Sequence, residues 1–175
     1  VEPESIPANG TGKLIVTYDS DAAATYGFAS HPIYSSLDGR NVYKNSVGVC
    51  ATLAEVFSHL SADESAQAQV AEFTETSFDF GDMTQGDKKE HTFSLTNNGK
   101  TDLIIRRVRS SCGCTAVAPS KKVIAAGETA PIKVTFDSRG KRGRQSKSIT
   151  VITNDPKTPT STLRISSQVV VPNAG

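Results

Sequence analysis

The chain has 175 residues, an apolar content of 37%, no tryptophan and a formal net charge of +1. These values suit one or two small domains with modest cores and argue against one large buried catalytic interior. Three cysteines are too few for a disulfide scaffold, and their odd number leaves at least one without a partner in the same chain. The sequence contains no apolar run of about 18 residues, so it predicts no membrane-spanning helix.

The near-neutral total hides an uneven distribution of charge. Residues 1–72 contain three basic and nine acidic side chains, whereas residues 73–175 contain sixteen basic and nine acidic ones. Two solvated surfaces of different sign account for this split, and so do electrostatic partners or head-to-tail contacts. Both interpretations remain open.

An internal repeat relates the two halves of the chain. A shift of 118 residues aligns residues 6–20 with residues 124–138 without a gap, and seven of the fifteen positions are identical. In the later copy about fifty residues of strand pattern precede the aligned turn. The chain is therefore expected to begin in the middle of a domain.

Residues 1–57 are predicted to form the C-terminal part of a first, truncated immunoglobulin-like module. Its expected strands are 13–18, 29–36 and 45–53, and Cys50 is expected to be a buried small apolar residue in the last of them. Because half a sandwich exposes strand edges and core faces, a second copy or the neighbouring module is expected to cover them.

Residues 58–72 change to a helical pattern and are predicted to be a linker. The run Ser61-Ala62-Asp63-Glu64 fits a capping box, in which the serine and the glutamate each satisfy a free backbone N–H at the start of a helix. Several alanines follow, and alanine favours the helix.

Residues 73–171 are predicted to form a complete seven-stranded immunoglobulin-like module, with 172–175 as a tail. Strand patterns occur at 73–80, 91–96, 103–109, 130–137, 146–153 and 162–170. Asn97-Asn98-Gly99 is typical of a type I′ hairpin turn. The predicted fold class is thus all-β: tandem immunoglobulin-like sandwiches, the first truncated at its N-terminus, joined by a short helical linker.

Several short motifs occur in a fixed order in the second module. They are Phe78-Asp79-Phe80-Gly81, Thr96-Asn97-Asn98-Gly99, Ser110-Ser111-Cys112-Gly113-Cys114-Thr115, Ile124-Ala125-Ala126-Gly127-Glu128, Val134-Thr135-Phe136-Asp137-Ser138 and Asn154-Asp155-Pro156. Together they resemble the bacterial family catalogued as domain of unknown function fifteen-seventy-three, over residues 73–171. The resemblance implies a sandwich akin to Hydin, major sperm protein and pilus-chaperone modules, in envelope proteins of Bacteroidetes-like bacteria that are often exported or lipid-anchored. It implies no reaction, because no catalytic activity is established for the family.

Cys112 and Cys114 are separated by a single glycine, and three interpretations of this pair remain open. The thiols are structural, with one in the core and one in a turn and with His91 capping the sheet end. Alternatively, they form a disulfide or redox pair, although residues i and i+2 of a strand lie near or beyond a comfortable Cα separation. The third interpretation is a soft-metal site of Cys112, Cys114 and His91.

A basic segment follows the strand pattern at 130–137 and is interleaved with glycines. Its members are Arg139, Lys141, Arg142, Arg144 and Lys147, and Arg106, Arg107 and Arg109 are candidates to extend it. A solvated loop explains the segment, and so does an anionic ligand or a protein partner. No aromatic residue lies in it, so no nucleic acid partner is expected.

Catalytic signatures are lacking. His31, His59 and His91 lie in three different segments, and neither Ser110 nor Ser111 has a general base adjacent in sequence. The sequence therefore predicts a non-catalytic, cofactor-free structural or protein-binding module of the periplasm or cell envelope. It is expected to contact a protein partner or a second copy through strand edges and the basic segment, with any lipid anchor outside these residues. The alternative is a metal-binding or thiol-redox protein that uses Cys112 and Cys114.

Overall fold

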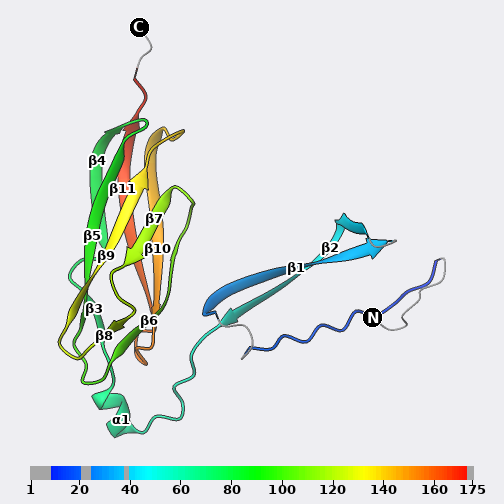
Figure 1. Ribbon diagram of the computed structural model, residues 1–175, viewed down its shortest axis with the longest axis horizontal. Helices are drawn as coiled ribbons and strands as arrows, with labels where there is room; N and C mark the ends of the chain where they lie inside the picture. Colours follow the sequence, from blue (N-terminus) through cyan, green and yellow to red (C-terminus); the bar gives the residue numbers. More distant parts are fainter. Residues whose placement is uncertain (1–8, 21–24, 38–39, 173–175) are drawn as a thin grey trace.

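The structure is a computed structural model that describes residues 9–20, 25–37 and 40–172 (Figure 1). The predictions for residues 1–8 and for most of the tail lie outside these ranges. The elements are β1 (Gly27–Leu37), β2 (Arg40–Leu53), α1 (Ala62–Gln67), β3 (Ala71–Phe73), β4 (Ser77–Thr84), β5 (Lys88–Asn97), β6 (Leu103–Ser110), β7 (Thr115–Pro119), β8 (Val123–Ile124), β9 (Thr129–Asp137), β10 (Gly143–Thr153) and β11 (Thr160–Val170). Within the described ranges, no helix has the length and apolar character needed to cross a membrane.

The second half of the chain is a β-sandwich of two sheets. One sheet has the strand order β4-β11-β10-β6-β8 and the other β3-β5-β9-β7. Neighbouring strands are antiparallel except for β4 and β11, which run parallel. Alternate residues of each strand face the core, as on β9, where Ile132, Val134 and Phe136 are buried and the residues between them are not. The predicted all-β class is confirmed.

The six strand patterns read from the sequence are all strands, but the count of seven is too low. The sandwich has nine strands, because the pattern at 73–80 is divided between β3 and β4 on different sheets and because β7 and β8 were missed. β8 has two residues, and β7 ends on Pro119, which an edge strand tolerates because one side of it needs no N–H donors.

The predicted hairpin turn at 97–99 is wrong. β5 and β6 belong to different sheets, so the chain crosses between them, and Gly99 does not have a positive φ. Asn97 is fully buried, and its side-chain amide donates to the carbonyl oxygens of Thr101 (2.8 Å) and Ile124 (2.9 Å). A Cβ on Gly99 would lie 2.3 Å from the carbonyl oxygen of Ala68, so glycine is required for close backbone approach.

The first half contains a two-stranded antiparallel hairpin, β1–β2, beside the sandwich (Figure 1). This confirms the strands expected at 29–36 and 45–53, whereas 13–18 is not a strand: Lys13 makes one isolated bridge, and the residues after it are extended without regular pairing. Cys50 is exposed, with its thiol 3.5 Å from the Ser30 hydroxyl. The expectation that Cys50 is buried is therefore wrong, because no second sheet packs on the hairpin at this point.

Helix α1 begins with the capping box that the sequence predicts. The Ser61 hydroxyl accepts from the backbone N–H of Glu64 (3.3 Å), and the Glu64 carboxylate accepts from the backbone N–H of Ser61 (2.8 Å), so both halves of the capping box are present. The helix ends at Gln67, and the chain continues extended into β3.

Two arginines of β6 attach the base of the hairpin to the sandwich. The register between β6 and β10 shifts by one residue, so that Arg107 and Ile105 are paired and Arg106 between them is not, as in a β-bulge. Arg106 forms a two-point ion pair with Glu55 (2.7 and 2.9 Å) and lies 5.3 Å from the centre of the Tyr26 ring. Hydrogen bonding to Glu55 raises the pKa of Arg106.

Arg107 completes this attachment. Its guanidinium donates to the carbonyl oxygens of Tyr26 (2.7 Å) and Phe28 (3.3 Å) and to the Thr25 hydroxyl (3.1 Å). A charged donor satisfies three acceptors at the start of β1, so the hairpin base is held against β6 by bonds stronger than neutral ones.

We expect Asn97→Ala to destabilise the sandwich by about 2–3 kcal/mol, because it leaves buried carbonyl and N–H groups unpaired. The matched control is Asn98→Ala at the exposed neighbouring position, which should cost less than about 0.5 kcal/mol. Urea unfolding of both variants measures the difference. Equal midpoints would contradict the assigned role of Asn97.

We expect Arg107→Ala to loosen the hairpin without destabilising the sandwich. A nitroxide on the exposed thiol of Cys50 should broaden a defined set of sandwich amide signals in the native chain, and this pattern should weaken and spread in the variant. Arg164→Ala, at an exposed position of the same sheet that does not line the cleft beside the hairpin, is the control and should leave the pattern unchanged. An unchanged pattern in Arg107→Ala would show that these bonds do not hold the hairpin.

Candidate functional site

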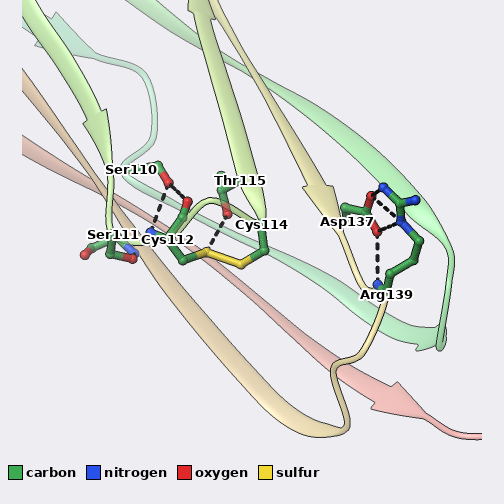
Figure 2. Close-up of a disulfide and its surroundings, with 8 residues drawn as sticks. Ser110, Ser111, Cys112, Cys114, Thr115, Asp137 and Arg139 are labelled. Carbon is green, nitrogen blue, oxygen red and sulfur yellow. Dashed lines mark hydrogen bonds and ion pairs between the residues drawn. A yellow bond between two sulfur atoms is a disulfide. The ribbon is translucent and has the colours of Figure 1, made fainter.

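The cysteine pair lies in the turn that follows β6 and forms a disulfide (Figure 2). The Cα atoms of Cys112 and Cys114 are 5.3 Å apart, a separation that a disulfide spans ordinarily. The objection to a disulfide applied to residues i and i+2 of a strand, where the Cα separation would be larger. The turn, closed by a bond from the Thr115 N–H to the Cys112 carbonyl oxygen (3.3 Å), brings them within reach.

The two serines before the pair shape this turn. The Ser110 hydroxyl donates to the Cys112 carbonyl oxygen and accepts from the Cys112 N–H (3.2 Å). Ser111 exchanges bonds with Ser148 on β10: its N–H donates to the Ser148 carbonyl oxygen (2.9 Å), and its hydroxyl accepts from the Ser148 N–H (3.1 Å). Both hydroxyls are thus engaged with the backbone, which is a structural role.

Each sulfur has a different environment. Cys114 packs against the hydrophobic core, whereas the Cys112 sulfur lies 3.6 Å from the buried Thr115 hydroxyl. Because a bridged sulfur carries no proton, the hydroxyl is the donor in this contact. Gly113 between them is exposed, and no atom outside residues 112–114 lies within 4 Å of the position that a Cβ would take.

His91 is not part of this turn. It lies on β5, stacked on Phe78 with ring centres 3.6 Å apart, and its Nε2 is 2.7 Å from the Glu75 carboxylate. The described part of the chain contains no group of three His, Cys, Asp or Glu side chains placed to hold a metal ion. The structure therefore does not assemble the three-ligand site of Cys112, Cys114 and His91, because the two sulfurs are bonded to each other and the imidazole is held elsewhere.

The basic segment forms the loop between β9 and β10 and the start of β10. Gly140 and Gly143 have positive φ values of 67° and 66°, which glycine adopts without cost, so they turn the chain. Arg139, Arg142 and Arg144 are exposed, whereas Lys141 and Lys147 are half-buried. The structure thus presents an arginine-rich surface at this end of the sandwich.

Part of this positive charge is already compensated. The Arg139 side chain donates to the Asp137 carboxylate (2.9 and 3.1 Å), and the Arg139 backbone N–H donates to the same carboxylate. Together these hydrogen bonds hold the pKa of Asp137 well below its usual range. Among the described residues, no carboxylate forms an ion pair with Lys141, Arg142 or Lys147. Arg142 is therefore the exposed cation most available to an anionic partner.

Arg144 belongs to a small polar hollow on the neighbouring strands. The pKa of Asp79 is lowered mainly by the Gly81 N–H, which donates to it at 2.8 Å, then by Ser166, and to a smaller extent by Arg144. Arg144 thus lies near one carboxylate but is not paired with it.

Sequence reasoning missed the contact between the hairpin and β6. An open cleft of about 490 Å³ lies there, lined on the hairpin side by Phe28 and His31 and on the sandwich side by Arg107 and Arg109. The run of arginines was interpreted as an extension of the basic segment. The register shift on β6, which turns Arg106 and Arg107 toward the hairpin, has no signature in the sequence.

Similar structures agree on the fold. A protein of unknown function from Porphyromonas gingivalis W83 matches with a TM-score of 0.64 and 22% identity over 82% of this chain and 66% of that one, so the chain spans just under two thirds of that protein. The ASH / PapD-like domain 7 of human CEP192 matches with a TM-score of 0.52 and 16% identity, over 70% of this chain and 99% of that domain. At these identities the likeness shows a PapD-like sandwich and nothing further. No curated protein matches the sequence.

A match to a family profile shows the family to which the chain belongs. It matches residues 71–169, more than half of the chain, in close agreement with the range expected from the ordered motifs. The chain belongs to the family described as Protein of unknown function (DUF1573).

Proposed function

We propose that the chain is a non-catalytic immunoglobulin-like module of the bacterial cell envelope that binds a protein partner or a second copy of itself. Contact is made by strand addition to the exposed apolar segment at 13–18, which would become a strand on pairing, and by the basic β9–β10 loop. The PapD-like fold and the membership of a family without established catalysis support binding over chemistry as the main role.

The observation that carries this proposal is an exposed apolar segment, residues 13–18, which belongs to no regular sheet. Leu14, Ile15 and Val16 are 45%, 55% and 43% exposed. Their counterparts in the repeat lie on β9, where Ile132 and Val134 are completely buried and the strand is paired on both sides by β5 and β7. Apart from the bridge at Lys13, this sequence, which suits the middle of a sheet, is not paired in a sheet. An added strand would pair its backbone and cover its apolar side chains.

The proposed tandem architecture has further support. The 118-residue shift places β1 on residues 145–155 and β2 on residues 158–171, close to β10 and β11. The first half then holds counterparts of the last three strands of the sandwich, in the same order. Residues 1–57 are thus proposed to be part of a second related module, with 58–72 as the linker.

Placement in the periplasm or envelope rests on two arguments. The Cys112–Cys114 disulfide is of a kind that persists in oxidising compartments and is rare where thiols are kept reduced. The family resemblance implies exported proteins as well.

We expect Leu14→Lys with Val16→Lys to weaken self-association at least tenfold, because two charges disrupt an apolar strand interface. Sedimentation equilibrium measures the effect. Val123→Lys with Val170→Lys is the matched control, since it adds the same charges at apolar positions of similar exposure (47% and 53%) on other strands. A strictly monomeric native chain, with rapidly exchanging amides at 13–18, would contradict self-association through this strand.

We expect Arg142→Glu with Arg144→Glu to weaken binding to an anionic glycan. Two lost attractions of about 1 kcal/mol each correspond to a drop of roughly tenfold or more. Heparin is the probe, and titration calorimetry at low salt is the measurement. Lys100→Glu with Lys157→Glu makes the same change in net charge at exposed positions at the other end of the sandwich and should alter binding little. Equal losses in both pairs would remove the β9–β10 loop from the proposal.

A further inference from the structure

The Cys112–Cys114 disulfide joins no two elements of the fold. It closes a turn between residues two apart in sequence, so it links neither the two sheets nor the hairpin to the sandwich. The stabilisation that a crosslink gives through the unfolded chain grows with the length of the loop it closes, so this bond lies near the lower end of the range. Packing and the serine bonds already shape the turn. The disulfide therefore needs another explanation than stability.

The bond is also open to attack from outside. Cys112 and Cys114 are both half-buried rather than enclosed, and Gly113 between them leaves free space where a side chain would stand. Figure 2 shows the two sulfurs bridging the turn, with Thr115 beside them. A thiolate on an extended segment of another protein can approach over Gly113 without displacing a side chain there.

The two sulfurs differ in a way that assigns them roles. Cys114 packs against the core, so Cys112 is the sulfur to which an attacking group has the better access. The Thr115 hydroxyl, 3.6 Å from the Cys112 sulfur, donates toward it. After reduction the same hydroxyl would stabilise the Cys112 thiolate, since a hydrogen bond to the charged form favours that form. A stabilised thiolate makes its disulfide easier to reduce and hence a better oxidant.

We propose that Cys112–Cys114 is an exchangeable disulfide that oxidises a dithiol segment of another exported protein, here called the client. This activity goes beyond the binding role proposed above and does not depend on it. Thr115 is a positioning residue for the exchange, acting through Cys112.

The exchange takes place in two steps. A client thiolate attacks the Cys112 sulfur, the bond between the two sulfurs breaks, and Cys114 leaves as a thiolate that takes up a proton. The second client thiolate then attacks the client sulfur of this mixed disulfide and expels Cys112 as a thiolate. The client loses two electrons and two protons and becomes a disulfide, and the chain becomes a dithiol. A low-molecular-weight disulfide, itself reduced to two thiols, restores the bond.

The first experiment measures the exchange itself. The background is Cys50→Ser, which removes the exposed free thiol on the hairpin. The probe is a synthetic peptide with two cysteines separated by two residues, mixed with the oxidised chain at equal concentration and followed by mass spectrometry. We expect peptide disulfide to appear together with two free thiols per chain, on Cys112 and Cys114. A chain disulfide that stays intact in excess peptide would overturn the proposal.

The second experiment tests the roles of the two sulfurs. In the same background, Cys114→Ser leaves Cys112 alone, and Cys112→Ser leaves Cys114 alone. We expect the first variant to form a mixed disulfide with the oxidised peptide about tenfold faster than the second, because Cys112 is the more accessible and the better stabilised thiolate. Circular dichroism of the reduced chain and of each variant controls for folding. Equal rates in folded variants would overturn the assignment.

The substitution Thr115→Val removes the hydroxyl and keeps nearly the same side-chain shape, so it tests the role of the hydroxyl. Loss of the donor should raise the pKa of the Cys112 thiol, so alkylation of the reduced chain by iodoacetamide should shift to higher pH. A rise of about one in that pKa lowers the exchange rate at pH 7 only about threefold, because a more basic thiolate is also the better nucleophile. Thr115→Ser keeps the hydroxyl and should restore both readouts, which a packing role alone would not. An unshifted alkylation profile in folded Thr115→Val would exclude the role of the hydroxyl.

Discussion

The crossing of the chain between the two sheets at Asn97 to Gly99 is the constraint on which the rest of the structure depends. Asn97 lies in the core without exposed surface, and its carboxamide bonds the crossing loop, while its backbone N–H donates to the Glu128 carbonyl oxygen (2.9 Å). Next to it, the lack of a side chain at Gly99 lets residues 68–70 pass in contact. On the other side of the same corner the Ala71 N–H donates to the buried Asp155 (2.9 Å). Since each buried group left unpaired would cost about 1–3 kcal/mol, these bonds favour this path for the chain that enters the sandwich.

The position of the first half follows from that corner together with the arginines of β6. The linker is fixed at Ala71, and the hairpin is fixed again where Arg107 bonds the start of β1 and Arg106 bonds Glu55 after β2. Two attachments on either side of a short linker restrict the hairpin far more than the linker alone would. They hold only its base, however, and the apolar side chains of the segment at 13–18 stay exposed. A firmly held base with a free edge is the geometry that strand addition by a partner requires.

Sequence patterns predicted the strands well because alternation reports which side of a strand is buried, a local property. They failed where the answer depended on contacts between distant segments. The sequence Asn-Gly occurs both in tight hairpin turns and in the crossing between sheets at Asn98-Gly99. Here the glycine is required because the backbone of residues 68–70 passes against it, a contact that the local sequence does not reveal. Cys50 was expected in a core because its neighbours are apolar, but the hairpin has no sheet packed on it there. The pairing of Cys112 with Cys114 required knowledge of a turn that depends on Ser148 in another strand.

The disulfide turn and the start of the basic loop are neighbours in space. The Asp137 N–H donates to the Cys114 carbonyl oxygen (3.0 Å), and the side chain of the same residue is bound by Arg139, as Figure 2 shows. If an acidic segment of a client bound the basic loop that follows Asp137, its cysteines would be brought toward Cys112 by binding rather than by chance encounter. The ion pair with Arg139 also keeps the Asp137 carboxylate from placing an uncompensated negative charge beside the turn, which would oppose formation of a thiolate there. The proposed binding and the proposed exchange would then share this end of the sandwich.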